Sequence, residues 1–370
     1  MIIKIDRGKL IEPLKHLVGV SEKKQTMPIL GNVLLRSDSD KLVMVGSDLE
    51  VEISSDVDHM CDEPVNVTMP AKKLLEILKS LPGEDQISID IAETKATIKS
   101  GKSKFVLATL PGADFPYERS TTEYAHHIST KNLDAIISQT SFSMAVQDAR
   151  HFLNGLFFEV GPDQITVVAT DGHRLSMSAC KQTNTITDAL NCIIPRKCIT
   201  EIKRILSSFK DSKEKIADFS INKTEFVFQI DNYCVKSKLI EGNYPDYNKV
   251  FPESLPHKLD VNKQEFKEAL QRMSILSNEQ FKGVKLSLSD TNVMLSTNNP
   301  SLEEGEDSIG CSYTGEQFDI GFNLTYLLEV IDVISSENIV LQLNNADSGC
   351  LISSGDDIAL NKYIIMPMRV

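Results

Sequence analysis

One short segment carries residue types that could do acid-base chemistry. Asp171-Gly172-His173-Arg174 places a carboxylate, an imidazole and a guanidinium within four positions. A general base needs a partner that orients it, and a nucleophile needs a base within hydrogen-bond reach. Asp48 and Asn298 stand at equivalent places in an internal repeat of the chain, and neither is followed by His-Arg. A residue type that recurs at the same turn is typical of structure, so we expect Asp171 to shape a turn.

Other motifs that carry chemistry are missing. The seven histidines include no His-x-x-x-His pair, and the phosphate-binding pattern Gly-x-x-x-x-Gly-Lys-Ser/Thr does not occur. The seven cysteines are an odd number and contain no Cys-x-x-Cys pair, the close spacing that a zinc site uses. We interpret them as buried small hydrophobic residues in a reducing compartment. We therefore predict no catalytic residue, no metal and no cofactor.

Six segments have the spacing of short amphipathic helices, with apolar residues at i, i+3, i+4 and i+7. They begin near Arg7, Ala71, Lys131, Arg196, Lys263 and Leu324. Short alternating runs such as Gln86–Ile91 lie between them and predict strands. The helix starts follow one another at nearly equal intervals, and this regularity indicates an internal repeat.

The repeat spans two helices, because short motifs recur at about twice the interval between helix starts. The segment around Val33 resembles those around Leu156 and Val284, which follow it in two nearly equal steps. Asp48, Asp171 and Asn298 are separated by almost the same two steps. We predict an α+β protein of three similar domains, each with two helices packed on antiparallel sheet. The expected ranges are 1–125, 126–253 and 254–370, with Gly and Pro at the first two exits.

The charge is divided unevenly between the helices and the rest of the chain. The formal net charge is −13, yet the six helix segments hold 14 basic and 8 acidic residues. Lysines that only solubilise helix surfaces explain this pattern as well as helices that face one polyanion do. Combined with the repeat, the pattern favours the interpretation that the helices together face one polyanion. No run is long enough to cross a bilayer, and the N-terminal strand pattern lacks a signal peptide, so we expect a cytoplasmic protein without a membrane partner.

Several motifs resemble the bacterial DNA sliding clamp family, the beta subunit of DNA polymerase III. They are Thr26–Asn32, Ala169–Leu175, Gly242–Tyr247, Ile275–Glu279 and Met366–Arg369, which fall in all three repeats and match in order and spacing. The resemblance implies the DNA clamp fold, with two subunits closed head to tail into a six-domain ring. It further implies a non-catalytic processivity factor that encircles double-stranded DNA without reading its sequence.

The resemblance also implies a hydrophobic pocket for short linear motifs of partner proteins. The partners would be the DNA polymerase III alpha subunit, the clamp loader, other polymerases and mismatch-repair proteins. The matching pocket positions are Leu153, Thr170, Gly172, His173, Arg174, Leu175, Pro245, Val250, Ile364, Met366, Pro367, Met368 and Arg369. Apolar side chains here would form a floor that an extended peptide fills, and methionine adapts to varied partners. Arg174 and Arg369 would orient polar or carboxylate groups at the rim.

Three stretches depart from the common family pattern. Lys249 stands where arginine is usual, which replaces a bidentate contact by a single-point one. His151-Phe152 replaces an aromatic pair beside the pocket, and the stretch 346–349 aligns poorly with the pocket wall and is left out of the predicted site.

Two further surfaces follow from the resemblance. Subunit closure into a homodimer would use Lys102, Lys104, Phe105 and Leu107 against Ile275, Leu276, Glu303, Glu304 and Glu306. The opposite charges of the two groups agree with this pairing. Candidate DNA-facing residues are Lys24, Lys72, Lys73, Arg150, Lys197, Lys203 and Arg204. The alternative is a non-catalytic repeat scaffold that binds proteins only, and it predicts basic helices on several faces.

Overall fold

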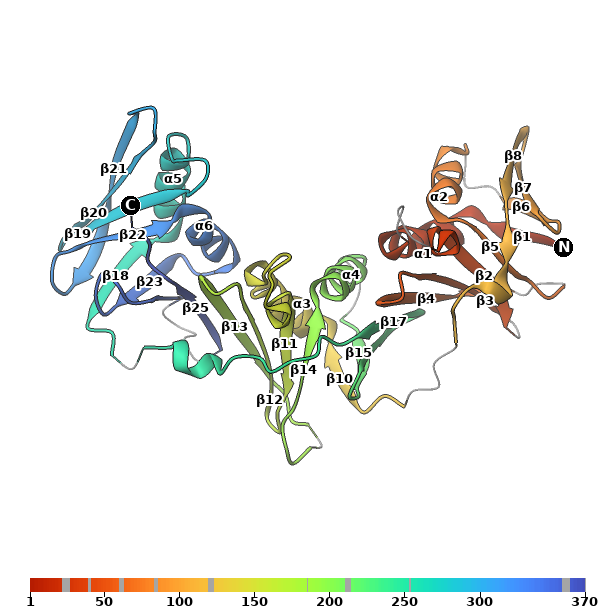
Figure 1. The fold of residues 1–370 in the computed structure, drawn as a ribbon, viewed down its shortest axis with the longest axis horizontal. Helices are drawn as coiled ribbons and strands as arrows, with labels where there is room; N and C mark the ends of the chain where they lie inside the picture. Colours follow the sequence, from red (N-terminus) through yellow and green to blue (C-terminus); the bar gives the residue numbers. More distant parts are fainter. Residues whose placement is uncertain are drawn as a thin grey trace. The chain divides into compact units, whose positions relative to one another are not determined.

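The computed structural model describes residues 1–21, 27–38, 41–59, 63–82, 86–118, 123–184, 186–209, 214–252, 254–354 and 360–369. The chain divides into two compact units. Unit 1 contains residues 1–133 and 197–239, and unit 2 contains residues 134–196 and 240–370. Both units combine α-helices with antiparallel sheets (Figure 1). The predicted α+β class is therefore confirmed.

Six α-helices lie in the described parts of the chain. They are α1 (Arg7–Val20), α2 (Ala71–Ser80), α3 (Thr130–Ser138), α4 (Arg196–Ser207), α5 (Lys263–Ser274) and α6 (Leu324–Val333). Five begin at the predicted residue, and α3 begins one residue earlier than predicted. Each has a buried apolar stripe, as in α2, where Leu74, Leu75 and Leu78 are buried while Lys72 and Lys73 are exposed.

Unit 1 contains two antiparallel sheets. Its strands are β1 (Ile2–Asp6), β2 (Asn32–Asp38), β3 (Lys41–Ser47), β4 (Val51–Asp58), β5 (Asn66–Pro70), β6 (Gln86–Ile91), β7 (Lys95–Ser100), β8 (Ser103–Ala108), β9 (Leu110–Pro111), β10 (His126–Ser129), β15 (Ile216–Ile221), β16 (Glu225–Ile230) and β17 (Tyr233–Lys238). The smaller sheet has the order β1-β6-β7-β8, and the larger one runs β10-β15-β16-β17-β4-β3-β2-β5-β9. Helix α1 packs on β3 and β4 and against α2 (Figure 1).

Unit 2 is organised around one long sheet. Its strands are β11 (Gly155–Val160), β12 (Gln164–Thr170), β13 (Arg174–Lys181), β14 (Leu190–Pro195), β18 (His257–Asn262), β19 (Gly283–Leu288), β20 (Asn292–Asn298), β21 (Glu304–Thr314), β22 (Asp319–Asn323), β23 (Asn338–Leu343), β24 (Cys350–Ser353) and β25 (Asn361–Ile365). The order is β14-β11-β12-β13-β25-β24-β23-β18-β21-β20-β19-β22. Helices α5 and α6 pack against each other, with α5 on β18, β20 and β21, and α6 on β22 and β25 (Figure 1).

Equivalent strands of successive repeats join the sheets in the same way. In unit 1, β4 pairs with β17, with Val51 opposite Ser237. In unit 2, β13 pairs with β25, with Arg174 opposite Ile365. Each residue of the second pair follows its counterpart in the first by the repeat step found in the sequence. The repeat therefore fixes strand register as well as the placing of helices.

Three kinds of feature are not found among the residues that the structure describes: a membrane-spanning helix, a metal-binding group and a disulfide. No helix among them is long and apolar enough to cross a membrane. No group of three or more His, Cys, Asp or Glu side chains in those ranges is placed to hold a metal ion. The six cysteines that the structure describes form no disulfide, and Cys61 lies outside the described residues.

A buried histidine makes unit 1 sensitive to acid. His16 of α1 is 6% exposed, and its ring meets Tyr233 edge-on with the ring centroids 5.2 Å apart. Burial, and to a lesser degree the nearby Arg204 guanidinium, lowers the pKa of His16 to about 4. As the pH falls, His16 is therefore protonated in the unfolded chain at a higher pH than in the folded protein. The stability of the folded state falls as the pH drops from about 6.5 to about 4.

We expect His16→Gln to reduce this acid sensitivity. The difference in unfolding free energy between pH 7 and pH 5 should shrink by on the order of 1 kcal/mol, since solvent screening reduces the full effect of such a pKa shift. Urea denaturation of both proteins at the two pH values measures it. An unchanged difference between the two pH values would show that His16 does not titrate in this window.

Candidate functional site

Unit 2 contains an apolar cavity of about 620 Å³. The 3-10 helix η4 (His151–Leu153), the turn between β12 and β13, the segment around the 3-10 helix η5 (Tyr247–Val250) and the end of β25 surround it. The lining residues are Arg150, Phe152, Leu153, Thr170, Gly172, Arg174, Leu175, Tyr244, Pro245, Tyr247, Lys249, Val250, Pro252, Ser348, Gly349, Ile364 and Met366.

The floor of the cavity comes from the pairing of β13 with β25. Leu175 and Ile364 stand opposite each other in the two strands, and both belong to a buried apolar cluster. Tyr244 packs on this cluster, with its ring stacked on Phe157 at a centroid distance of 4.9 Å. The Tyr244 hydroxyl donates a hydrogen bond to the Val168 carbonyl oxygen at 3.3 Å. One wall is therefore held by both stacking and a hydrogen bond.

Asp171 organises the turn that forms another wall. Its Oδ1 accepts hydrogen bonds from the amides of His173 at 2.9 Å and Arg174 at 3.1 Å. Asp48 does the same in unit 1, where its Oδ1 accepts from the amides of Glu50 and Val51 at 2.9 and 2.7 Å. Such local side-chain caps stabilise turns. The predicted structural role of Asp171 is confirmed.

The third repeat departs slightly from this pattern. There Asn299, one residue beyond Asn298, accepts hydrogen bonds from the amides of Ser301 and Glu303. Asn298 itself lies at the end of β20.

Arg174 lines the cavity and is held by several contacts within unit 2. Its side chain is 8% exposed, and its guanidinium donates to Asp171, Glu329 and the Phe142 carbonyl oxygen. The Tyr326 ring also lies under the guanidinium, with its centroid 4.3 Å from Cζ. Each nitrogen of the guanidinium already has an acceptor within the protein. The expected role of Arg174 in orienting a partner carboxylate stays a prediction.

Nine of the thirteen predicted pocket residues line the cavity. The four others are His173, Pro367, Met368 and Arg369. His173 is exposed at the tip of the turn, where its carbonyl oxygen accepts from the Met366 amide at 2.9 Å. The Met368 amide donates to the Gly321 carbonyl oxygen at 2.9 Å, which ties the chain end to β22.

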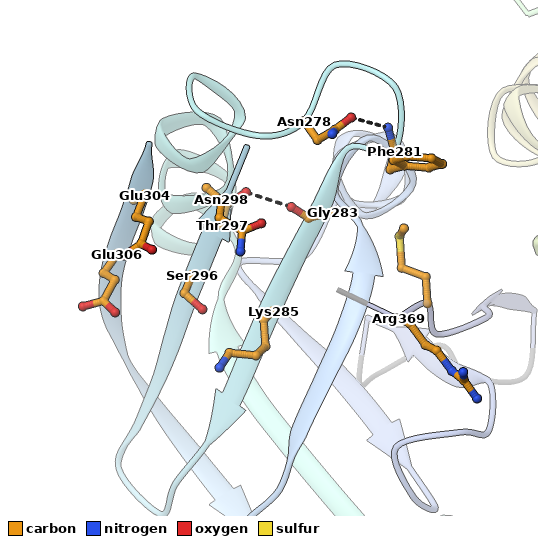
Figure 2. A pocket seen from close by; sticks show the side chains of 12 residues that line it. Asn278, Phe281, Gly283, Lys285, Ser296, Thr297, Asn298, Glu304, Glu306 and Arg369 are labelled. Carbon is orange, nitrogen blue, oxygen red and sulfur yellow. Dashed lines mark hydrogen bonds between the residues drawn. The ribbon is translucent and has the colours of Figure 1, made fainter. Parts of the chain in front are cut away.

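Met368 and Arg369 therefore line a different hollow of about 480 Å³ on the third repeat. Figure 2 shows Arg369 at one side of this hollow and Glu304 and Glu306 at the other. The backbone bond from Met368 to Gly321 holds this part of the chain beside β22. Placing Met368 and Arg369 in the peptide pocket stays a prediction.

The cavity also includes residues that the sequence did not assign to it. Ser348 and Gly349 line it, although the stretch 346–349 was left out of the predicted site. Arg150, predicted to face DNA, also lines this cavity, and its guanidinium donates to Asp148 at 2.9 Å and to the Asp171 carbonyl oxygen at 3.1 Å. The hydrogen bonds that Asp148 accepts from the side chain and the amide of Arg150 lower the pKa of Asp148 to about 2. Arg150 thus gives the cavity a polar rim.

Aromatic and basic side chains complete the wall. The remaining lining residues are Phe152, Tyr244, Tyr247, Lys249 and Pro252. None is in the predicted site, although Phe152 and Lys249 were noted as departures from the family pattern. Lys249 is largely exposed and pairs with Asp246, with 3.4 Å between Nζ and Oδ2. The sequence signal for Tyr244 was the motif with Gly and Pro at the end of the second repeat, because Phe115 occupies the same place in the first repeat. Tyr247 follows three residues later in the same segment.

The predicted subunit contacts fall on two strand edges. β8 is the outer strand of its sheet, and it carries Lys104, Phe105 and Leu107. The first part of β21 pairs with β20 on one side. On the other side, β21 pairs with β18 only from Cys311 onward. Ile275 is 78% exposed, and Leu276 packs beside Gly305 of β21. Both groups thus lie at strand edges in the part of the chain that the structure describes, but the Leu107 side chain is buried, at 7% exposed.

Comparison with known proteins identifies the family. Family models for the N-terminal, central and C-terminal domains of the DNA polymerase III beta subunit match residues 1–119, 127–246 and 248–369. The chain belongs to the DNA polymerase III beta subunit family.

Related clamps match it from end to end. The beta sliding clamp of Pseudomonas aeruginosa is 38% identical over 368 residues, which cover 99% of each chain. A crystal structure of the Pseudomonas aeruginosa subunit matches with a TM-score of 0.93 and 37% identity over both complete chains. A Bartonella birtlesii sliding clamp bound to griselimycin matches with a TM-score of 0.94 and 31% identity, again over both complete chains.

The resemblance drawn from the motifs is therefore confirmed, as is the three-domain clamp fold. The chain is a sliding clamp subunit that confers processivity in DNA replication, and it is a non-catalytic subunit of DNA polymerase III. The alternative of a scaffold that binds proteins only is set aside by these matches.

The basic residues predicted to face DNA lie mainly on two helices of the clamp subunit. Lys72 and Lys73 are exposed on α2, and Lys197, Lys203 and Arg204 lie on α4. Lys197 binds the Asp48 carboxylate, and Arg204 binds Glu201 and the Lys15 carbonyl oxygen. Lys24 lies outside the described residues.

We expect Tyr244 to hold the cavity wall of this clamp. Tyr244→Ala should lower the unfolding free energy of unit 2 by about 2–3 kcal/mol, because it removes a partly buried aromatic ring that packs on the cluster. Tyr244→Phe should cost only about 1 kcal/mol, because it keeps the stacking and loses one hydrogen bond. Urea denaturation followed by circular dichroism measures both values. Equal losses in the two variants would contradict the role of the ring.

Proposed function

We propose that two copies of this chain close into a ring around duplex DNA and that the apolar cavity of unit 2 binds short linear motifs of partner proteins. The observation that carries this proposal is the cavity itself, which combines an apolar floor with a polar rim. Above the buried floor, Met366 and Val250 offer exposed side-chain surface that an extended peptide can cover. Arg150 and Lys249 supply charge where the peptide leaves the floor.

The proposed partners are the DNA polymerase III alpha subunit, the clamp loader, other polymerases and mismatch-repair proteins. Sliding clamps of Pseudomonas aeruginosa and Bartonella birtlesii with this fold are bound to griselimycin. We propose that the cavity of unit 2 takes griselimycin in this chain. A methionine at the edge of an apolar floor suits a surface that accepts several partners.

The proposed ring closes through strand edges. β8 would pair with the first part of β21 of the second copy, which would cover two otherwise open edges. Lys102 and Lys104 would then lie near Glu304 and Glu306, which are exposed beside the hollow in Figure 2. Asp307 is less available, because Arg272 already holds its carboxylate at 2.6 Å.

We further propose domains at residues 1–125, 126–253 and 254–370 and a cytoplasmic location. The ranges of the three family models support the domain bounds. Lys72, Lys73, Lys197, Lys203 and Arg204 would contact phosphates, which carry no sequence information.

Retention on DNA tests the ring. A clamp loader places the protein on a nicked circular plasmid, and the plasmid is then cut. We expect the protein to resist high salt on the circle and to slide off after cutting, because a closed ring is held topologically. Release from the intact circle by salt would mean binding by charge alone, because contacts to phosphates weaken steeply with salt.

The double variant Ile275→Ala, Leu276→Ala should dissociate the ring. It removes exposed apolar surface at the proposed seam, and we expect weaker dimers in analytical ultracentrifugation and no retention on the circle. Thermal denaturation of the monomer serves as the folding control. A fully dimeric double variant would disprove this assignment of the seam.

The variants Met366→Ala and Met368→Ala should show which of the two hollows binds the ligand. Both were expected from the sequence to weaken partner binding, but only Met366 lines the cavity of unit 2. We expect Met366→Ala to weaken griselimycin binding about tenfold, since it removes apolar contact, and Met368→Ala to leave it within about twofold. Isothermal titration calorimetry measures both affinities. An equal loss in the two variants would place the ligand across both hollows.

A further inference from the structure

The wall of the apolar cavity depends on a residue that does not line the cavity. Arg174 begins β13 and is itself a cavity-lining residue, with a guanidinium that reaches the Phe142 carbonyl oxygen. The next residue, Leu175, faces the cavity, and Ser176 points to the opposite face, as alternation along a strand requires. Ser176 Oγ lies 2.6 Å from Ser143 Oγ of the 3-10 helix η3 (Ser141–Ser143) on that face. Arg174 also meets α6, which packs on β22 and β25.

Arg174 is the centre of a set of contacts within unit 2. Its Nε donates to Asp171 Oδ2 at 3.1 Å, and its Nη2 donates to the Phe142 carbonyl oxygen at 2.8 Å. Its Nη1 donates to Glu329 Oε2, and Glu329 lies on α6. Each nitrogen of the guanidinium therefore has an acceptor, and the planar group cannot turn without losing one of them.

The same carboxylate that holds Arg174 also shapes the cavity wall. Asp171 uses Oδ2 for the guanidinium and Oδ1 for the amides of His173 and Arg174. Gly172, which lines the cavity, lies between Asp171 and His173 and has φ +88°. Its amide donates a hydrogen bond to Thr170 Oγ1 at 3.1 Å. A shift of the guanidinium would therefore pull on the turn that carries Gly172.

We propose that Glu329 is a positioning residue for the peptide site, acting through Arg174 and Asp171 to fix the turn from Thr170 to Arg174. This inference rests on the proposed peptide-binding function. Glu329 is not among the residues that line the cavity, whereas its partner Arg174 is, so the bond between them links Glu329 to the cavity wall. Supporting contacts of this kind set how well a binding site is held in its productive geometry.

The test uses two changes at Glu329 and one control on the same helix. Glu329→Ala removes the acceptor, whereas Glu329→Gln keeps a neutral oxygen for Nη1. Asp332→Asn is the matched control, because Asp332 lies on α6 and pairs with Lys267 of α5 at 2.6 Å, away from the turn. Griselimycin is the probe, measured by calorimetry on the full-length dimer.

We expect Glu329→Ala to weaken griselimycin binding about threefold to tenfold, because it removes one charged hydrogen bond from a residue that supports the site. Glu329→Gln should recover part of the loss, and Asp332→Asn should bind like the unchanged protein. A second readout is hydrogen exchange of the segment 170–175. Exchange there should be faster in Glu329→Ala and unchanged in Asp332→Asn, a difference that a general loss of helix stability does not produce.

Unchanged affinity and unchanged exchange in Glu329→Ala would overturn the inference. Equal effects in Glu329→Ala and Asp332→Asn would also overturn it, because they would reflect the stability of α6 alone. Absence of griselimycin binding to the unchanged protein would contradict the proposed peptide site instead. The exchange measurement would then still decide whether Glu329 holds the turn.

Discussion

The antiparallel pairing of β13 with β25 is the interaction on which the rest of unit 2 depends. It joins residues 174–178 to residues 361–365, which are far apart in the chain, and makes one continuous sheet from two repeats. Because successive side chains leave a strand on opposite faces, the same pairing serves two purposes. Leu175 and Ile364 form the cavity floor, whereas Arg174 and Tyr363 contact the segments that carry α6 and η3.

The equivalent pairing in unit 1 shows how one geometry supports different surfaces. Glu52 and Lys236 stand opposite each other in β4 and β17, at the places that Leu175 and Ile364 occupy in unit 2. A polar cavity of about 180 Å³ lies there, lined by Glu52, Cys234 and Tyr124 among others. Burial raises the pKa of Glu52 to about 7. The repeated backbone therefore fixes the position of a site, and the side chains decide whether it is apolar.

Particular residues show how far sequence reasoning reached. Asp48 and Asp171 were identified as turn residues from their repeat positions alone, and both cap turns through the amides two and three residues on. Local hydrogen bonds of this kind follow from the order of residues, so the sequence predicts them well. The surroundings of Arg174 were not predictable in this way. Its partners Phe142 and Glu329 lie 32 and 155 residues away in the chain.

The sequence by itself determined the helices, the three-fold repeat, the turn at Asp171 and the family, because these depend on periodicity and on neighbouring residues. Only the tertiary structure decided which residues share the cavity. Ser348 and Gly349 enter its wall, Arg150 forms part of its rim, and Met368 is held beside β22 by its bond to Gly321. These placements depend on strand pairing and backbone anchors between distant segments. No local pattern of side chains records such contacts, because their geometry exists only after the chain has folded.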